Sequence, residues 1–231
     1  MIRKAVGKDK VDISKLHYMA GEHFFKYFFA TTKKTALNIL DRLYEPPDTI
    51  FSKDFFWVHE DQGTIRGAIS LFPGRDKKFL EENIGKHGKD LAQIAGYFTA
   101  IKMLFRGSLH KYMPPIYEDE LYIQALAVFP AYRGQRVASA LLQHAFHYAK
   151  QQHVPKVSLL VEIPNEHAIM VYNKYGFRIT TTQHFKRKYQ KHKLYGVHKM
   201  VAAVRGSKNK GFMPYKAPSV AAQRKDRKPL R

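Results

Sequence analysis

Apolar positions along this chain change repeatedly between strand-like and helix-like spacing. Compact apolar runs bounded by Gly, Pro and other turn residues predict strands at residues 2–6, 55–59, 64–72, 121–129, 156–162, 177–182 and 194–204. Apolar residues at helical spacing predict helices around residues 24–29, from Thr31 or Thr32 to Pro46, and at 91–105, 137–149 and 165–176. The pattern therefore predicts an α/β (α+β) domain.

Two of the predicted helices have unusual apolar patterns. The aromatic run at 24–29 is too dense for one narrow apolar face, so it predicts a helix that is buried on several sides or lines a hydrophobic pocket. The repeat at 91–105 lies in a helical insert at about 76–113. A helix packed on the core is the simplest interpretation of that repeat.

Residues 121–162 have the order strand, loop, helix, strand. The loop contains Arg133, Gly134, Gln135 and Arg136. A helix start presents unpaired backbone N–H groups and the positive end of the helix dipole, and a glycine lets a phosphate approach that backbone closely. The loop therefore predicts a pyrophosphate site, and a solvated basic turn is the alternative.

Two sequence blocks carry a family resemblance. LAVFPAYRGQRVASALL at 126–142 resembles the cofactor-binding motif of the GNAT superfamily of N-acetyltransferases, with Arg133 and Ala138 matching its ends and Arg136 where the family usually has glycine. VEIPNEHAIMVYNKYGF at 161–177 resembles the family's later strand and helix, including Asn165 and Tyr172. The resemblance covers about residues 1–204, which we expect to form one N-acetyltransferase domain.

The resemblance implies a mixed, mainly antiparallel central sheet with splayed central strands, flanked by helices, and acetyl-CoA as co-substrate. By this resemblance, Asn165 contacts the cofactor arm and Tyr172 is the general acid. Backbone groups of the strand would meet the acetyl-pantetheine end, at Leu126, Ala127 and Val128. Backbone groups of the loop and first helical turn would meet the pyrophosphate, at Arg133, Gly134, Gln135, Arg136, Val137, Ala138 and Ser139.

The expected reaction is direct attack of a primary amine on acetyl-CoA in a ternary complex. Strand alternation predicts that Glu120, Tyr122, Gln124 and Leu126 share one side, and Glu120 is the candidate base, directly or through water. Two other interpretations of Glu120 and its acidic neighbours at 118–119 stay open: they could bind a cationic amine, or they could form an ordinary solvated turn. The aromatic run and the helical insert are expected to shape the acceptor pocket, for a small amine, a peptide N-terminus or a lysine.

Charge is concentrated at the end of the chain. The net charge is +21, and residues 184–231 carry 15 Lys and Arg against one acid, Asp226. Few apolar residues and high charge predict a disordered basic tail at 205–231. Such a tail attracts polyanions, so a nucleic-acid-associated protein is the alternative function, and the tail is a candidate for polyanion contact in either case.

Several classes of site and location are not expected. The chain has no cysteine, which excludes disulfides and thiolate catalysis. His144, His147 and His153 do not have a recognisable metal-ligand spacing, so no metal site is predicted. We find neither a run of about 18 apolar residues nor a secretory signal, which predicts a cytoplasmic protein without membrane contact. The oligomeric state and the identity of the acceptor stay open.

Overall fold

A seven-stranded sheet forms the centre of the computed structural model, which describes residues 1–87, 92–93 and 95–204. The strands lie in the order β1-β2-β3-β4-β5-β7-β6, and every neighbouring pair is antiparallel except β4 and β5, which are parallel. Their bounds are β1 Ile2–Lys4, β2 Phe56–Asp61, β3 Thr64–Pro73, β4 Glu120–Val128, β5 Lys156–Glu162, β6 Arg178–His184 and β7 Gly196–Ala203. The predicted fold class is confirmed.

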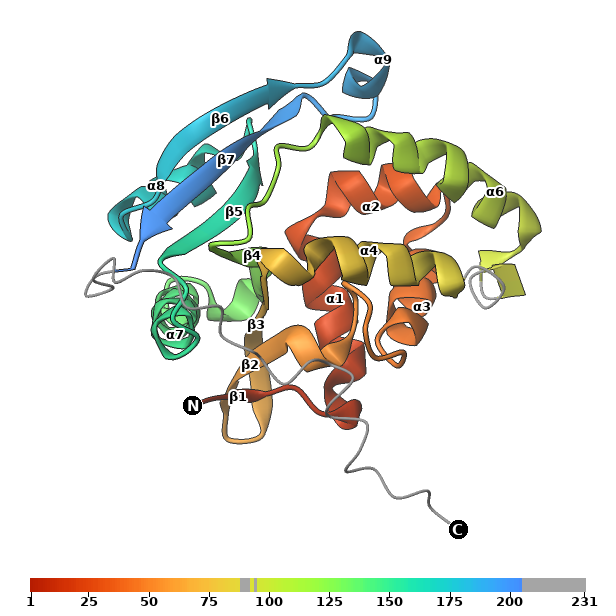
Figure 1. The fold of residues 1–231 in the computed structure, drawn as a ribbon. Helices are drawn as coiled ribbons and strands as arrows, with labels where there is room; N and C mark the ends of the chain where they lie inside the picture. The colour runs from red at the N-terminus through yellow and green to blue at the C-terminus, as the bar shows by residue number, and fades with distance from the viewer. Residues whose placement is uncertain (88–91, 94, 205–231) are drawn as a thin grey trace.

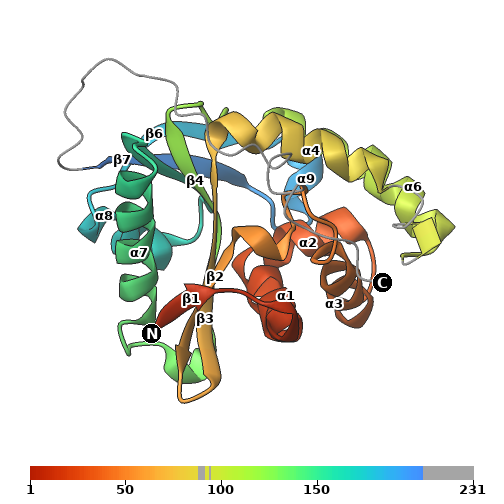
Figure 2. The same cartoon turned by 60° about the horizontal axis from the view of Figure 1, so that its bottom comes forward.

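Helices cover both faces of this sheet (Figures 1 and 2). One side carries α1 Lys10–Ala20, α2 Glu22–Phe29, α3 Lys33–Leu43, α4 Lys77–Lys86 and α6 Tyr97–Arg106, and the other carries α7 Val137–Gln151 and α8 Glu166–Lys174. The short helix α9, Arg187–Gln190, lies in the connection between β6 and β7. Single 3-10 turns are found at Gly7–Asp9, Lys53–Phe55, Gly74–Asp76, Gly107–Tyr112 and Pro130–Tyr132.

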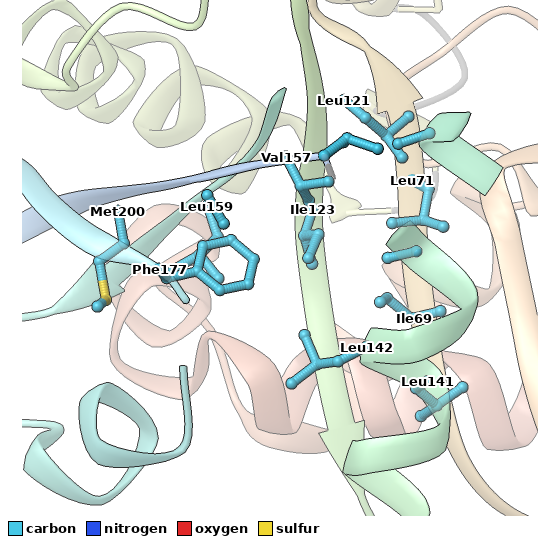
Figure 3. Packing of buried hydrophobic residues seen from close by; sticks show 14 of the residues in the cluster. Ile69, Leu71, Leu121, Ile123, Leu141, Leu142, Val157, Leu159, Phe177 and Met200 are labelled. Atoms are coloured by element: carbon cyan, nitrogen blue, oxygen red, sulfur yellow. The ribbon is translucent and has the colours of Figure 1, made fainter. Parts of the chain in front are cut away.

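The hydrophobic core is divided by the sheet. On the α7 side, apolar side chains of α7 interlock with alternate residues of the central strands, including Leu141 and Leu142 against Ile69 and Ile123 (Figure 3). On the other side, α1 to α3 contribute a second cluster that includes Ile13, Leu16, Phe25, Phe29, Ile39 and Leu40. The aromatic run of α2 is therefore partly core, as its density predicted.

The insert between β3 and β4 differs from its predicted packing. Its apolar repeat was expected to face the core, but Phe98, Leu104 and Phe105 of α6 are 79%, 80% and 78% exposed. α6 buries Met103, and Arg106 donates a hydrogen bond to the carbonyl of Tyr27 in α2. The side of α6 that includes Met103 and Arg106 therefore packs on the fold, and most of its apolar face is exposed. Leu91 and Ile94, also in the predicted repeat, lie outside the described residues.

The last described residue is part of the packed fold. Val204, just past β7, is buried and its N–H donates to the carbonyl of Pro155 at 2.9 Å. The predicted tail, 205–231, lies outside the described residues, so its disorder stays a prediction.

Candidate functional site

The parallel pair β4 and β5 separates along its length. Residues Glu120–Ile123 pair with Lys156–Leu159, but β4 continues to Val128 and β5 to Glu162 without further pairing between them. On its other edge β4 stays paired with β3 as far as Val128. Within the described residues, one edge of β4 beyond Ile123 therefore faces a gap instead of a strand, and its peptide groups are available to an extended ligand.

A bulge in β4 turns its side chains at the start of this gap. Ser70 of β3 pairs with Ala125, and Leu71 pairs with Ile123, so Gln124 has no partner residue. Ile123 before the bulge and Leu126 after it both face the α7 side. The predicted alternation, which placed Leu126 on the same side as Glu120, is wrong because one extra residue in a strand shifts every later side chain to the opposite face.

The loop between β4 and α7 forms an open cradle of backbone donors. Within the described part of the chain, the amide N–H groups of residues 134–139 meet no acceptor, and the first returning bond runs from Ala140 N to the carbonyl of Arg136 at 3.0 Å. Gly134 has φ of 77°, and a Cβ there would meet nothing within 4 Å. The loop therefore leaves room for an anion beside six unpaired donors at a helix start.

Arg136 stands where the family usually has glycine, and it adopts a backbone conformation that glycine favours. Its φ and ψ are 60° and 13°, in the left-handed region that glycine adopts most easily. The cradle keeps its shape at a small conformational cost, and the substitution adds a cation beside it. Arg133 and Arg136 are both exposed, and among the described residues neither pairs with a carboxylate.

Side chains of the loop hold it against the β2–β3 hairpin. Gln135 Nε2 donates to the carbonyl of Ala131 at 3.1 Å, and its Oε1 accepts from Arg66 at 3.3 Å. The guanidinium of Arg66 also lies 5.2 Å from the ring centre of Tyr132 and pairs with Asp61. The predicted cofactor residue Gln135 is thus engaged within the protein through its side chain, while its N–H stays free.

The start of α8 borders the gap from the β5 side. Asn165 Oδ1 accepts from Ala168 N at 3.2 Å, so this residue caps the helix. Tyr172 lies two turns along α8, with its ring 5.8 Å from that of Phe177 at the edge of the α7-side core. Burial raises the pKa of Tyr172 to about 12, because removal of water disfavours the phenolate. The tyrosine is therefore a protonated donor at neutral pH.

Glu120 occupies a closed ion pair. Its Oε1 lies 2.8 Å from Lys199 Nζ, and the two side chains are 2% and 3% exposed. Its Oε2 accepts from Tyr117 N at 3.2 Å, and Lys199 also donates to the carbonyl of Pro115 at 2.6 Å. Glu120 belongs to the paired end of β4, so this geometry favours a structural function over proton abstraction.

The acidic neighbours of Glu120 do not form a cluster with it. Asp119 pairs with Lys156 at 2.6 Å on the surface, and Glu118 is exposed. The three carboxylates therefore point into different environments.

A carboxylate–histidine pair that the sequence analysis missed lies where β5 ends. Glu162 Oε2 is 2.9 Å from His23 Nδ1 of α2, and the side chains are 29% and 38% exposed. Glu162 is past the last residue of β5 that pairs with β4, so it lies beside the gap. The two residues are far apart in the sequence. In the sequence, the only sign of this pair is the position of Glu162, within the family-like block and before Asn165.

Other kinds of site have no support in the described residues. Residues 1–87, 92–93 and 95–204 contain no group of three His, Cys, Asp or Glu side chains that could hold a metal ion. The ring of His144 packs against that of Trp57 at a tilt of 50°, with ring centres 5.5 Å apart. In the same part of the chain, no helix combines the length and apolar composition of a membrane span.

Comparison with known proteins gives a consistent result. Residues 22–177 match the model of the Acetyltransferase (GNAT) family. The fold is similar to that of an N-acetyltransferase from Staphylococcus aureus Mu50, with 24% identity, a TM-score of 0.62, and coverage of 87% of this chain and 100% of that chain. It is also similar to the ribosomal-protein-S18-alanine N-acetyltransferase from Escherichia coli, with 13% identity, a TM-score of 0.51 and coverage of 92% and 99%. No curated protein sequence matches the chain.

Proposed function

Because the chain belongs to the GNAT family of acetyltransferases, we propose that it transfers the acetyl group of acetyl-CoA directly to a primary amine. The family uses acetyl-CoA, and this co-substrate supplies an activated thioester carbonyl. The observation that carries the proposal is the succession of two features from β4 onward. Its unpaired edge beyond Ile123 is followed, after the short turn Pro130–Tyr132, by the open donor cradle before α7.

The described residues fit the two chemically different ends of this co-substrate. The N–H groups of residues 134–139 and the guanidinium groups of Arg133 and Arg136 complement a pyrophosphate. The free edge of Leu126, Ala127 and Val128 offers peptide groups to an amide-containing arm, as an added strand would use them. Asn165 would reach the same arm from β5's side while it caps α8.

Proton transfer defines the remaining roles. As the amine nitrogen bonds to the acetyl carbon, the carbon–sulfur bond breaks, the amine loses a proton and the sulfur gains one. Tyr172, whose hydroxyl stays protonated, is the proposed acid that protonates the sulfur. Glu162, oriented by His23, is the proposed base, directly or through water. The base function predicted for Glu120 stays a prediction, and its closed ion pair argues against it.

The test is a steady-state and product analysis with the full chain. With acetyl-CoA and a panel of amines, we expect release of the CoA thiol together with an acceptor that is heavier by one acetyl group. Direct attack predicts intersecting lines when both substrates are varied, and no acetylated protein when the amine is omitted. Parallel lines with a stable acetyl-protein would refute direct transfer. Absence of CoA binding would refute the proposed function itself.

The alternative function, polyanion binding through residues 205–231, concerns a segment outside the described residues. It stays a prediction and is compatible with acetyl transfer.

A further inference from the structure

The connection between β6 and β7 is strongly basic. Residues 185–195 contain five Lys and Arg and no Asp or Glu: Lys186, Arg187, Lys188, Lys191 and Lys193. Within residues 1–87 and 95–204, none of these cations has a carboxylate partner. Their charge is therefore not neutralised by neighbouring acids of the described fold.

Aromatic packing fixes this basic connection against α2. Tyr189 of α9 is 2% exposed, and its ring lies 5.6 Å from that of Tyr27 in α2. The ring centre of His192 lies 5.0 Å from that of Tyr27. Figure 2 shows α9 next to α2. The cations around Tyr189 are thus held at a fixed place on the fold.

A small pocket forms where the connection meets α2. It is lined by His23, Lys26, Tyr27, Lys191, His192 and Lys193. Lys26 pairs with Glu22 at 2.6 Å on the outer surface of α2, whereas Lys191 and Lys193 have no carboxylate partner among the described residues. The guanidinium of Arg106 lies over the other side of Tyr27, 4.9 Å from its ring centre, and adds to the positive potential. No lining residue is acidic.

One residue of this pocket also contacts the proposed reaction centre. His23 lines the pocket and also contacts Glu162, the proposed base at the edge of the gap. An acceptor that gives up its proton at Glu162 and extends past His23 would therefore bring its other groups to Lys191 and Lys193. Those two lysines would attract an anionic group and repel a second cation.

We propose that the pocket between α2 and the β6–β7 connection selects amine acceptors that carry an anionic group, a carboxylate or a phosphate, close to the acetylated nitrogen. This inference rests on the proposed function and specifies its acceptor class. It excludes polycationic amines as good substrates, since a second ammonium group would enter a pocket lined only by neutral and positive side chains.

The experiment compares peptides that differ only in charge. Four peptides with a free N-terminus carry, after the first residue, two Asp, two Asn, two Lys or two phosphoserines. The variant K191Q/K193Q removes two charges from the pocket. The matched control K8Q/K150Q removes two exposed charges on other elements.

We expect kcat/KM to be at least about 100-fold higher for the Asp peptide than for the Lys peptide at low salt, with the Asn peptide between them. Each pocket lysine should contribute up to about 10-fold, the factor that corresponds to about 1.4 kcal/mol. The K191Q/K193Q variant should lose the preference for the Asp peptide, while its kcat/KM for the Asn peptide should change by less than about 3-fold. The control K8Q/K150Q should keep the preference. The preference should also shrink as salt rises. A higher rate for the phosphoserine peptide than for the Asp peptide assigns the anion as phosphate, and the reverse assigns it as carboxylate.

Equal rates for the Asp and Lys peptides would overturn the inference, as would an equal loss for charged and neutral peptides in K191Q/K193Q. Charge-independent acetylation combined with oligonucleotide binding that K191Q/K193Q removes would also overturn it, in favour of a nucleic-acid contact. These outcomes leave the proposed function intact, because acetyl transfer is still observed. Failure of acetyl-CoA binding is the separate result that refutes the proposed function.

Discussion

Replacement of Glu120 by Gln tests how the sheet tolerates a charge in its interior. The variant keeps the shape of the side chain but leaves the ammonium of Lys199 without its counter-charge, in a position where the lysine is 3% exposed. The carbonyl of Pro115 remains as a partner but supplies no charge. Loss of one member of such a buried pair costs about 3–5 kcal/mol of unfolding free energy. For a domain of this size, that corresponds to a fall in Tm of roughly 6–20 °C.

The adjacent residue provides the matched control. Asp119 pairs with Lys156 at 2.6 Å, but the side chains are 37% and 45% exposed, so D119N should cost less than about 1 kcal/mol. Urea unfolding followed by circular dichroism measures both variants. The double variant E120Q/K199M should recover part of the loss, because it removes the unpaired charge. Equal, small losses for E120Q and D119N would show that the Glu120–Lys199 pair is not desolvated as its geometry indicates.

The same variant separates the structural from the catalytic interpretation of Glu120. At a temperature where E120Q is fully folded, we expect its kcat to stay within about 3-fold of the parent. Removal of the proposed base in E162Q should lower kcat by about 10²- to 10⁴-fold, the range of general acid–base catalysis. The opposite order of effects would restore Glu120 as the base and exclude Glu162.

The other expected outcomes concern the cofactor cradle, the acid and the tail. G134D should weaken acetyl-CoA binding in calorimetry by at least about 100-fold, whereas G63D, at a glycine with the same φ of 77° and equally open space, should not; similar affinities would remove the loop from the site. Y172F should lower kcat by about 10- to 1,000-fold with cofactor binding nearly unchanged, and full activity would exclude this acid. Because burial raises the pKa of Tyr172 to about 12, ionisation of this group should not reduce kcat between pH 7 and 10, and a loss that disappears in Y172F would contradict that assignment. Truncation after Val204 should preserve Tm and acetylation of a small amine but weaken polyanion binding, and an unfolded product would move the domain boundary.

The central strands and α7 could be predicted because they bury apolar residues at regular spacing. The helix at α7 places Leu141, Leu142 and Ala145 against the sheet, and that spacing is visible in the sequence. The donor cradle was predictable for a similar reason, since a glycine before a helix start is a local feature. Local patterns therefore predicted both the main elements of the sheet and the donor cradle.

Features that depend on a single inserted residue or on distant contacts were not predictable. The bulge at Gln124 reverses the facing of later residues of β4, and the only local sign is one polar side chain within an apolar strand. The contact between His23 and Glu162 requires α2 to lie across the end of β5. The exposed face of α6 has the same periodicity as a buried one, because periodicity shows that a face is apolar but not what covers it.

The basic residues near the end of the chain fall into two groups, one within the described fold and one after it. In sequence, the cations from 184 to 231 form one basic block with a single acid. In the fold, the members at 185–195 are anchored through Tyr189 beside the proposed reaction centre, before β7 completes the sheet. An anchored charge acts on the acceptor bound in the pocket, whereas residues 205–231 follow the last element of the domain. Truncation after Val204 should therefore weaken polyanion binding while the acidic-peptide preference persists. Joint loss of both properties in a folded, active truncation would show that the tail, and not the pocket, sets acceptor charge.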